Sequence, residues 1–267
     1  MLRLEYRNVT MTFGQAGGAG SLTAVQDVSL AVADGEVVAL IGPSGCGKST
    51  LLNIGSGLAA PTQGAAYVDG ERVEGPNTHV AFMLQKDLLL PWRTIEDNAM
   101  LGIEIQRRDR AEARRRVRNL LQGFGLAEFA NHYPHQLSGG MRQRAALART
   151  LAVDPSVLLL DEPFSAVDAQ TRIILQCDLA RTLQHAGKTA LLITHDLLEA
   201  VILSDRVLVM SRRPGRIIDE IAIDIPGRDD PLVRRRSSKV GEYVARLMNR
   251  LDIHEGAIPQ GGARAIA

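Results

Sequence analysis

Residues 42–50 read GPSGCGKST and directly follow the apolar run Val37–Ile41. A buried strand that ends in a glycine-rich turn and then opens a helix is typical of a nucleotide-phosphate site, because small residues let successive backbone N–H groups converge on phosphate oxygens. Lys48 is expected to reach the β- and γ-phosphates, and the Ser49 hydroxyl to ligate Mg²⁺. The alternative is a glycine-rich turn with a purely structural role. The strand before the turn and the helix-forming residues after it disfavour that alternative.

The bulk composition predicts one large α/β unit. The chain has 267 residues, of which 45% are hydrophobic, so it can build one large core rather than two independent domains. Its net charge is +1 with intermixed signs, which gives no global attraction for nucleic acid. Cys46 and Cys177 lack a metal-ligand pattern and suit a reducing cytosol. Without a signal-peptide pattern or a stretch approaching roughly 18 apolar residues, we expect a soluble chain whose membrane role comes through a partner.

Alternating apolar residues in the first third predict a mixed sheet around one helix. Residues 2–6 and 28–32 alternate as half-buried strands do. We interpret Asp34-Gly35 as the turn of a hairpin that joins the second of these strands to residues 36–41. A second hairpin is predicted around Asp69-Gly70, followed by a short strand over residues 80–84. Residues 15–21 are expected to form a flexible loop.

Residues 94–152 change to a helical pattern, which predicts a helical subdomain of about 86–155 inserted into the sheet. Thr94 opens an S/T-x-x-D/E sequence, the form of a helix N-terminus. Residues 117, 120, 121 and 124 form one apolar face under a surface that carries seven arginines between residues 107 and 118. We interpret these arginines as a solvated face. Contact with lipid headgroups or an acidic partner is the alternative.

The last part of the chain predicts alternating strands and helices. Continuous apolar runs at residues 157–160, 190–193 and 207–210 are typical of parallel strands buried on both faces. Helices over 168–184 and Leu197–Leu203 fit between them as βαβ units. The main domain is therefore predicted over 1–228. The segment 229–267 is predicted to hold one amphipathic helix over 231–251 and a disordered tail over 256–267.

Two further segments place polar groups where phosphate chemistry needs them. In LSGGMRQR, residues 137–144, Ser138 and two glycines precede a predicted helix. Ser138 has the residue type of a simple cap, but two consecutive glycines cost helix stability while opening N–H groups to an anion. Asp161 and Glu162 end a buried strand, at the edge where open α/β sheets bind ligands. Asp161 suits Mg²⁺, and Glu162 is the candidate base for an attacking water.

Together these motifs resemble the ATP-binding cassette (ABC) ATPases, the motor subunits of ABC transporters, over about residues 4–225 and in the family's order. GPSGCGKST matches the Walker A loop, Gln85 the Q-loop, LSGGMRQR the signature and residues 158–162 the Walker B strand. Residues 165–168 resemble the D-loop, with Val167 where leucine is commoner, and His195 matches the H-loop histidine. The resemblance implies an α/β fold of the P-loop NTPase type: an ABC-type cassette with a mixed-sheet core, an antiparallel β subdomain and an inserted α-helical subdomain.

The resemblance also implies the roles of individual residues, with ATP and Mg²⁺ as cofactors. Catalytic roles fall to Lys48, Gln85, Glu162 and His195, and metal-ligand roles to Ser49, Gln85 and Asp161. The residues implied to bind ATP are Phe13, Gly42, Pro43, Ser44, Gly45, Cys46, Gly47, Lys48, Ser49 and Thr50; Phe13 alone also reads as a plain core aromatic. The residues implied to contact the ATP of a second copy are Leu137, Ser138, Gly139, Gly140 and Gln143, with Asp168 in the D-loop.

Family membership would further imply that two chains sandwich two ATP molecules head to tail. The implied partners are a second copy, transmembrane permease subunits and, indirectly, a periplasmic or extracellular substrate-binding protein, with no nucleic acid. The implied location is the cytoplasmic face of the inner membrane, as a peripheral subunit.

Three short segments resemble the importer subgroup that serves nitrate, sulfonate, taurine and related small anions. They are LLLPW at 88–92, YPHQ at 133–136 and SRRPGRI at 211–217. We interpret Trp92 as a docking anchor, with local core packing as the alternative. The competing function is a soluble ABC ATPase acting on nucleic acid or ribosomes, although the short separation of Lys48 and Asp161 leaves no room for a long coiled coil. A P-loop kinase is disfavoured by LSGGMRQR.

Overall fold

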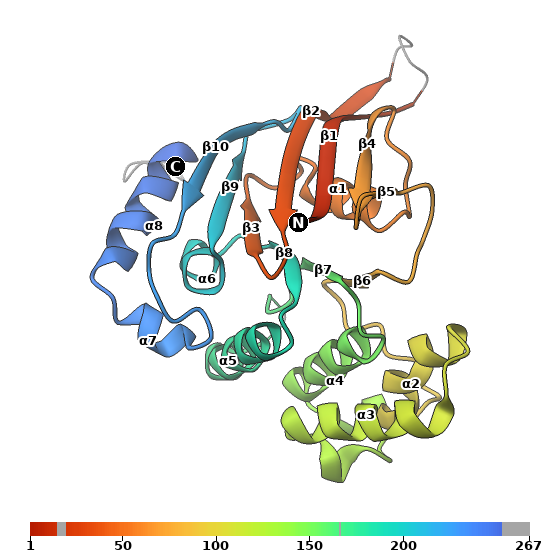
Figure 1. Cartoon of the computed structure of the whole chain (residues 1–267). Coiled ribbons are helices and arrows are strands. Elements are labelled where there is room, and N and C mark those ends of the chain that lie inside the picture. The colour runs from red at the N-terminus through yellow and green to blue at the C-terminus, as the bar shows by residue number, and fades with distance from the viewer. Residues whose placement is uncertain (15–19, 166, 253–267) are drawn as a thin grey trace, which may run out of the picture.

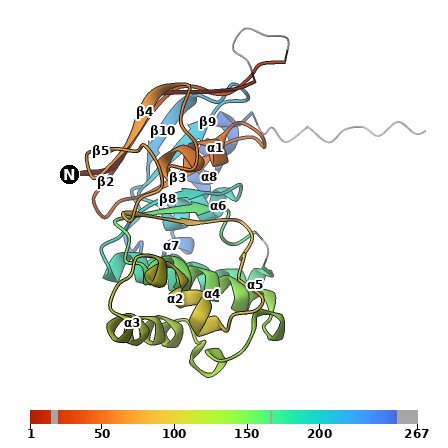
Figure 2. The same ribbon diagram turned by 90° about the vertical axis from the view of Figure 1, so that its right-hand side faces the viewer.

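The computed structural model describes residues 1–14, 20–165 and 167–252. Two β-sheets lie beside each other, and the helices α2, α3 and α4 form a separate group at the opposite end of the molecule (Figure 1). The view from the side shows the same arrangement, with α5 beside α4 (Figure 2). Within these described ranges, no helix combines the length and the apolar character that crossing a membrane requires.

The first sheet is antiparallel and has four strands in the order β2-β1-β4-β5. Its strands are β1 (Leu2–Phe13), β2 (Leu22–Ala33), β4 (Gln63–Val68) and β5 (Glu71–Arg72). The pair β4–β5 turns at Asp69-Gly70, where both residues have positive φ, so the second predicted hairpin is confirmed. The predicted loop at 15–21 lies mostly outside the described residues.

The second sheet is the core of the molecule and has six strands in the order β10-β9-β3-β8-β7-β6. Its strands are β3 (Val37–Ile41), β6 (Val80–Met83), β7 (Val157–Asp161), β8 (Thr189–Ile193), β9 (Arg206–Met210) and β10 (Ile217–Ala222). All neighbours pair in parallel except β9 and β10. Every residue of β3 and β8 is buried, as the continuous apolar runs predict. Parallel pairing therefore brings the carboxyl ends of these strands to one edge.

One predicted hairpin is wrong. The turn at Asp34-Gly35 joins β2 to β3, but β2 pairs with β1 in the first sheet, whereas β3 pairs with β8 and β9 in the second. The reason is burial, because a strand with five buried residues needs partners and cover on both sides. The dipeptide thus connects two sheets rather than two paired strands.

Helix α1 (Lys48–Gly55) packs between the two sheets, where Leu51, Leu52 and Ile54 join one apolar cluster with residues of both. The remaining helices cover the other face and one end of the second sheet. They are α2 (Ile95–Ile105), α3 (Arg110–Gly123), α4 (Gly139–Ala152), α5 (Ala169–His185), α6 (Leu197–Leu203), α7 (Pro231–Arg235) and α8 (Lys239–Arg250), with short 3₁₀ turns at Ala127–Phe129 and Pro134–Gln136. Thr94 caps α2 by accepting a bond from the Asp97 N–H, as its sequence predicts.

The arginine-rich surface of α3 is largely paired. Arg114 and Arg118 both form ion pairs with Glu96, Arg110 pairs with Glu104, and Arg116 pairs with Asp154. The partners come from α2 and from the turn after α4, so these charges fasten α3 to its neighbours. The interpretation of a solvated face, with lipid or partner contact as its alternative, stays a prediction.

The predicted C-terminal helix is two helices. Arg236, Ser237 and Ser238 separate α7 from α8, and serine favours caps and turns over helix interiors. Helix α8 buries Val240 and Leu247 in a cluster with residues of β3, β9 and α6. The predicted disordered tail at 256–267 lies outside the described residues.

Candidate nucleotide site

The loop between β3 and α1 has the conformation that its glycines allow. Gly45 has φ of 75° and Gly47 has φ of 102°, a region that other residues avoid. A Cβ atom at Gly47 would lie 2.4 Å from Val25 Cγ1, so only glycine fits there. The first turn of α1 has no side-chain cap, which leaves its N–H groups for another acceptor. Lys48 is 8% exposed, and its Nζ donates to the carbonyl oxygens of Gly42 (2.7 Å) and Pro43 (3.1 Å).

Asp161 lies beside this loop at the end of β7. Helix α1, which carries Ser49 in its first turn, packs against β7, which ends at Asp161. Burial raises the pKa of the Asp161 carboxyl, and the Ser49 hydroxyl and the Lys48 charge oppose that shift. A hydroxyl and a carboxylate are the hard oxygen ligands that Mg²⁺ prefers. In the part of the chain that the structure describes, no group of three or more His, Cys, Asp or Glu is arranged to hold a metal by itself.

The Glu162 side chain, just after β7, contacts residues that follow two other strands of the sheet. Gln85, which follows β6, donates from Nε2 to Glu162 Oε2 at 3.1 Å. His195, which follows β8, places Nδ1 at 3.2 Å from the same oxygen. Glu162 has φ of 46°, an uncommon conformation for a residue with a side chain, and its N–H donates to the Ile193 carbonyl at 2.9 Å. Gln85, Glu162 and His195 are thus brought together as the sequence predicts.

The second predicted anion-binding element opens α4. The Ser138 hydroxyl accepts a bond from the Met141 N–H at 3.3 Å and therefore caps the helix. A Cβ atom at Gly139 would make only an ordinary contact with Arg142 Nη2, at 3.9 Å, but one at Gly140 would lie 2.4 Å from Thr171 Cγ2 of α5. Gly140 is therefore also required for close packing of the two helices.

Leu137 and Gln143, which are also predicted to contact the ATP of a second copy, are both buried within this chain. Leu137 is buried in the core cluster of the helical group. The buried Gln143 side chain donates to the Pro163 carbonyl at 2.5 Å, in the loop after Glu162. Leu137, just before α4, and Gln143, on α4, thus hold the start of this helix against the interior.

Comparison with known proteins agrees with this geometry. The family model described as ABC transporter matches residues 25–165. The chain belongs to the ABC transporter family. It is 44% identical to the taurine import ATP-binding protein TauB of Jannaschia sp. over 220 residues, and these aligned residues cover 82% of each chain. It is 46% identical over 226 residues to the nitrate import ATP-binding protein NrtC of Synechococcus elongatus, which covers 84% of this chain and 34% of that longer one.

A solved ABC cassette has the same fold. The dimeric structure of a post-hydrolysis state of the cassette MJ0796, bound to ADP and Pi, superposes with a TM-score of 0.73 and 32% identity over 83% of this chain and 99% of that one. The predicted P-loop NTPase fold of the ABC type is confirmed. The chain is therefore an ABC ATPase, and the loop at 42–50 has the sequence of the family's Walker A loop.

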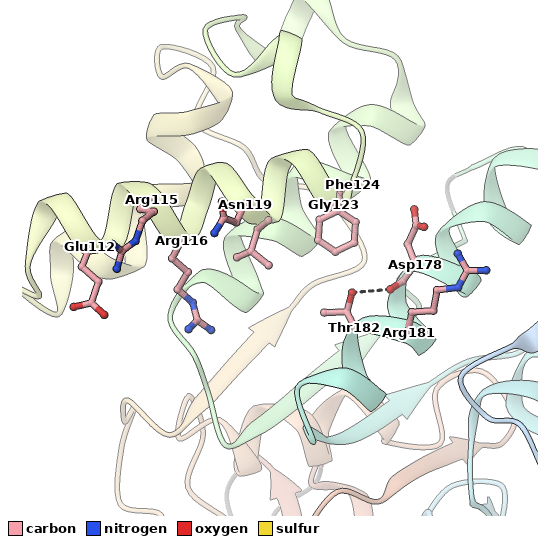
Figure 3. A pocket seen from close by; sticks show the side chains of 10 residues that line it. Glu112, Arg115, Arg116, Asn119, Gly123, Phe124, Asp178, Arg181 and Thr182 are labelled. Carbon is pink, nitrogen blue, oxygen red and sulfur yellow. Dashed lines mark hydrogen bonds between the residues drawn. The ribbon is translucent and has the colours of Figure 1, made fainter.

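Two more of the predicted site residues lie at the ends of other elements. Asp168 caps α5 by accepting a bond from the Thr171 N–H, and Phe13 ends β1 with 47% of its surface exposed. A cavity of 640 Å³ lies next to the Walker A loop, between Pro43, His195 and Arg213. Another groove, of 460 Å³, lies between α3 and α5, where Arg115, Phe124 and Asp178 line it (Figure 3). None of the predicted site residues lines that second groove.

Trp92 lies on the surface. It is 72% exposed, and Leu88 in the same segment is 52% exposed. The alternative of local core packing for Trp92 is therefore wrong. Ile105, at the far end of α2, is also on the surface, at 73% exposed. The segment thus presents apolar side chains to the outside.

Sequence reasoning missed a buried polar group just after the H-loop. Glu199 of α6 is 3% exposed, and its carboxylate accepts a bond from Gln176 of α5 at 3.3 Å. The N–H of Glu199 donates to Asp196, which caps α6 one residue after His195. Burial raises the pKa of the Glu199 carboxyl to about 7 from its ordinary 4.5. A glutamate on a largely apolar helix was the only sequence indication.

We expect Glu199 to make the stability of the cassette pH-dependent. Its folded pKa is raised, so its contribution to stability is fully present below pH 4.5 and is lost as the pH rises through about 7. Glu199→Gln, which stays neutral, should gain about 3 kcal/mol relative to the parent between pH 4.5 and pH 8. Urea unfolding at both pH values measures this difference. Glu242→Gln, on the exposed side of α8, is the control, and an equal pH dependence in parent and Glu199→Gln would refute the assignment.

Proposed function

We propose that this chain is the ATP-hydrolysing subunit of a membrane importer of small anions, such as taurine, nitrate or a related sulfonate. The observation that carries the ATPase part is the convergence of Lys48, Ser49, Asp161 and Glu162 at one sheet edge. The import names of the relatives TauB and NrtC support the class of cargo. They give no support to the alternative of an ATPase that acts on nucleic acid or ribosomes.

The site residues take roles that follow from their positions. Lys48 and the N–H groups of the Walker A loop, with neighbouring residues 42–50, would hold the phosphates, and Phe13 would stack on the adenine. Ser49 and Asp161, with the Gln85 amide oxygen, would hold Mg²⁺. When bound, that ion would neutralise charge on the phosphates.

Glu162 is placed to orient and deprotonate the attacking water. Its carboxylate end is fixed by Gln85 and His195, and its backbone by Ile193, so the base has one defined position. His195 would also contact the γ-phosphate. Because Gln85 follows β6 and touches Glu162, it would link the base to the segment at 88–92.

Glu162→Gln tests the base directly. The amide cannot accept the proton, so we expect ATP to bind normally but turnover to fall at least about a hundredfold, the scale of general-base loss. Lys48→Ala should instead lose nucleotide affinity. Phosphate release and nucleotide binding separate these two effects. Glu128→Gln, an exposed glutamate away from the site, serves as the matched control. Near-normal turnover in Glu162→Gln would remove the residue from this role.

The assembly that we propose is a head-to-tail dimer in which Ser138, Gly139 and Gly140 contact the ATP of the partner copy. Within this chain Ser138 opens α4 in the helical group, whereas Lys48 opens α1 between the two sheets (Figure 1). One chain therefore presents two anion-binding helix starts in different places, of which only the Walker A loop has a lysine. The dimeric state of MJ0796 supports this arrangement.

ATP-dependent dimerisation follows from this assembly. In the Glu162→Gln background, light scattering with ATP and Mg²⁺ should show a dimer, because hydrolysis no longer reopens it. Adding Ser138→Arg should abolish the dimer, since a bulky cation would occupy the contact with the partner's ATP. Ser238→Arg, at an exposed serine before α8 that makes no cap bond, should leave it intact. A monomer at every concentration of Glu162→Gln with ATP would contradict the sandwich.

We further propose that the permease docks beside the Q-loop, which would place the chain at the cytoplasmic face of the membrane as a peripheral subunit. A cavity of 390 Å³ between β6, α2 and α4 is lined by Phe82, Leu101, Ile105 and Val153. Exposed Leu88 and Trp92 lie on the segment that runs from Gln85 to α2. An external substrate-binding protein would act on this chain only through the permease.

Trp92 is the anchor to test. Trp92→Ala should keep the ATPase activity of the isolated chain while weakening co-purification with the permease, because losing a large apolar anchor typically costs about 2 kcal/mol or more of binding. Ile218→Ala removes an exposed apolar side chain on β10 and is the control. If Trp92→Ala assembles and transports normally, the docking site lies elsewhere.

A further inference from the structure

A loop distant in sequence holds the Walker A loop from outside. Residues 211–216, SRRPGR, connect β9 to β10. The guanidinium of Arg213 donates twice to the Gly45 carbonyl, from Nε at 2.9 Å and from Nη2 at 2.7 Å. The segment was read from sequence only as a mark of an importer subgroup, and the proposed catalytic roles do not use it.

The backbone of this loop is fixed on two sides. Its Gly215 N–H donates to the Ala24 carbonyl and its Gly215 carbonyl accepts from the Gln26 N–H, each at 2.9 Å, which ties the loop to β2. On the other side, a Cβ atom at Gly215 would lie 2.0 Å from the Cys46 carbonyl oxygen, so the loop is pressed against the Walker A backbone. Arg213 is therefore held in place two residues before this contact.

The carbonyl that Arg213 binds belongs to the most adaptable part of the Walker A loop. Gly45 is exposed and has φ of 75°, and glycine resists rotation of the neighbouring peptide less than any other residue. On the same peptide unit, the Cys46 N–H donates to the Pro43 carbonyl at 3.3 Å. Arg213 thus holds the carbonyl, and Pro43 the N–H, of the peptide that joins Gly45 to Cys46. The orientation of this peptide sets the direction of the adjoining N–H groups.

We propose that Arg213 is a positioning residue that keeps the Walker A loop in its phosphate-binding conformation. It acts on the loop through the Gly45 carbonyl, whereas the Lys48 ammonium donates to the carbonyls of Gly42 and Pro43. The inference rests on the proposed role of residues 42–50 in holding phosphate. Its consequence is that Arg213 sets the affinity for nucleotide rather than the rate of the chemical step.

The test is the split between KM and kcat in Arg213→Ala. Two hydrogen bonds from a charged group are lost, but at an exposed position, so we expect the KM for ATP and the Kd for ADP to rise about five- to tenfold. The kcat at saturating ATP should stay within about twofold. Arg213→Lys keeps the charge but not the planar fork, and should show a smaller rise. Arg216→Ala removes the same charge from the same loop and should leave KM and Kd unchanged.

Several outcomes would overturn the proposal. The first is an unchanged KM for ATP in Arg213→Ala, and the second is a fall in its kcat without a rise in KM. The third is an equal rise of KM in Arg216→Ala, because loss of net charge would then be the cause. If circular dichroism shows that Arg213→Ala does not fold, Arg213→Lys decides by the same measurements. Lys48→Ala, assayed in parallel, distinguishes the phosphate role of the loop from the positioning role of Arg213. Normal nucleotide binding in Lys48→Ala would refute the phosphate role of the loop itself. Loss of binding in Lys48→Ala, with no loss in Arg213→Ala, would refute only this inference.

Discussion

Parallel pairing of β3, β8, β7 and β6 is the constraint on which the site depends. Because the four strands run in the same direction, the residues that follow each of them emerge at one edge of the sheet. The Walker A loop, Gln85, Asp161 with Glu162, and His195 are delivered in this way from four distant parts of the sequence. Burial of the strands on both faces leaves little freedom of register, so the polar groups meet at hydrogen-bond distance without long loops.

Gathering these groups is costly, and the surrounding fold must hold them. Lys48 is almost buried, burial raises the pKa of Asp161, and Glu162 has an uncommon backbone conformation. Each of these three features by itself raises the free energy of the folded state. Such features persist only where the neighbouring structure fixes them. Here the neighbours are the two apolar clusters on the faces of the second sheet. The packing of the core thus offsets the free-energy cost of holding these charged groups together at the sheet edge.

Local signals made much of the fold predictable from sequence. The Walker A loop, the cap at Thr94, the cap at Ser138 and the continuous apolar runs each depend on neighbouring residues alone. Asp34-Gly35 was misread because a turn dipeptide fixes a change of direction but not the partner of the next strand. The burial of Leu137 and Gln143 depends on how α4 packs against the rest of the molecule, so no local pattern indicates it. The bond from Arg213 to Gly45 joins segments far apart in sequence, so no local pattern indicates it.

Helix α4 connects the parts of the cassette that a partner would touch. It begins at Ser138, and its Gln143 is bonded to Pro163 in the loop after Glu162. On the same helix, Arg142 pairs with Asp87 at 3.0 Å, and Arg149 donates to the carbonyl of Leu88 at 2.8 Å, in the segment after Gln85. These bonds tie α4 to two loops, so a shift of α4 would change contacts at both the catalytic loop and the segment that carries Trp92. A second copy bound at Ser138 and a permease bound at Trp92 would therefore both act on α4. That helix is hydrogen-bonded through Gln143 to Pro163, the residue next to Glu162.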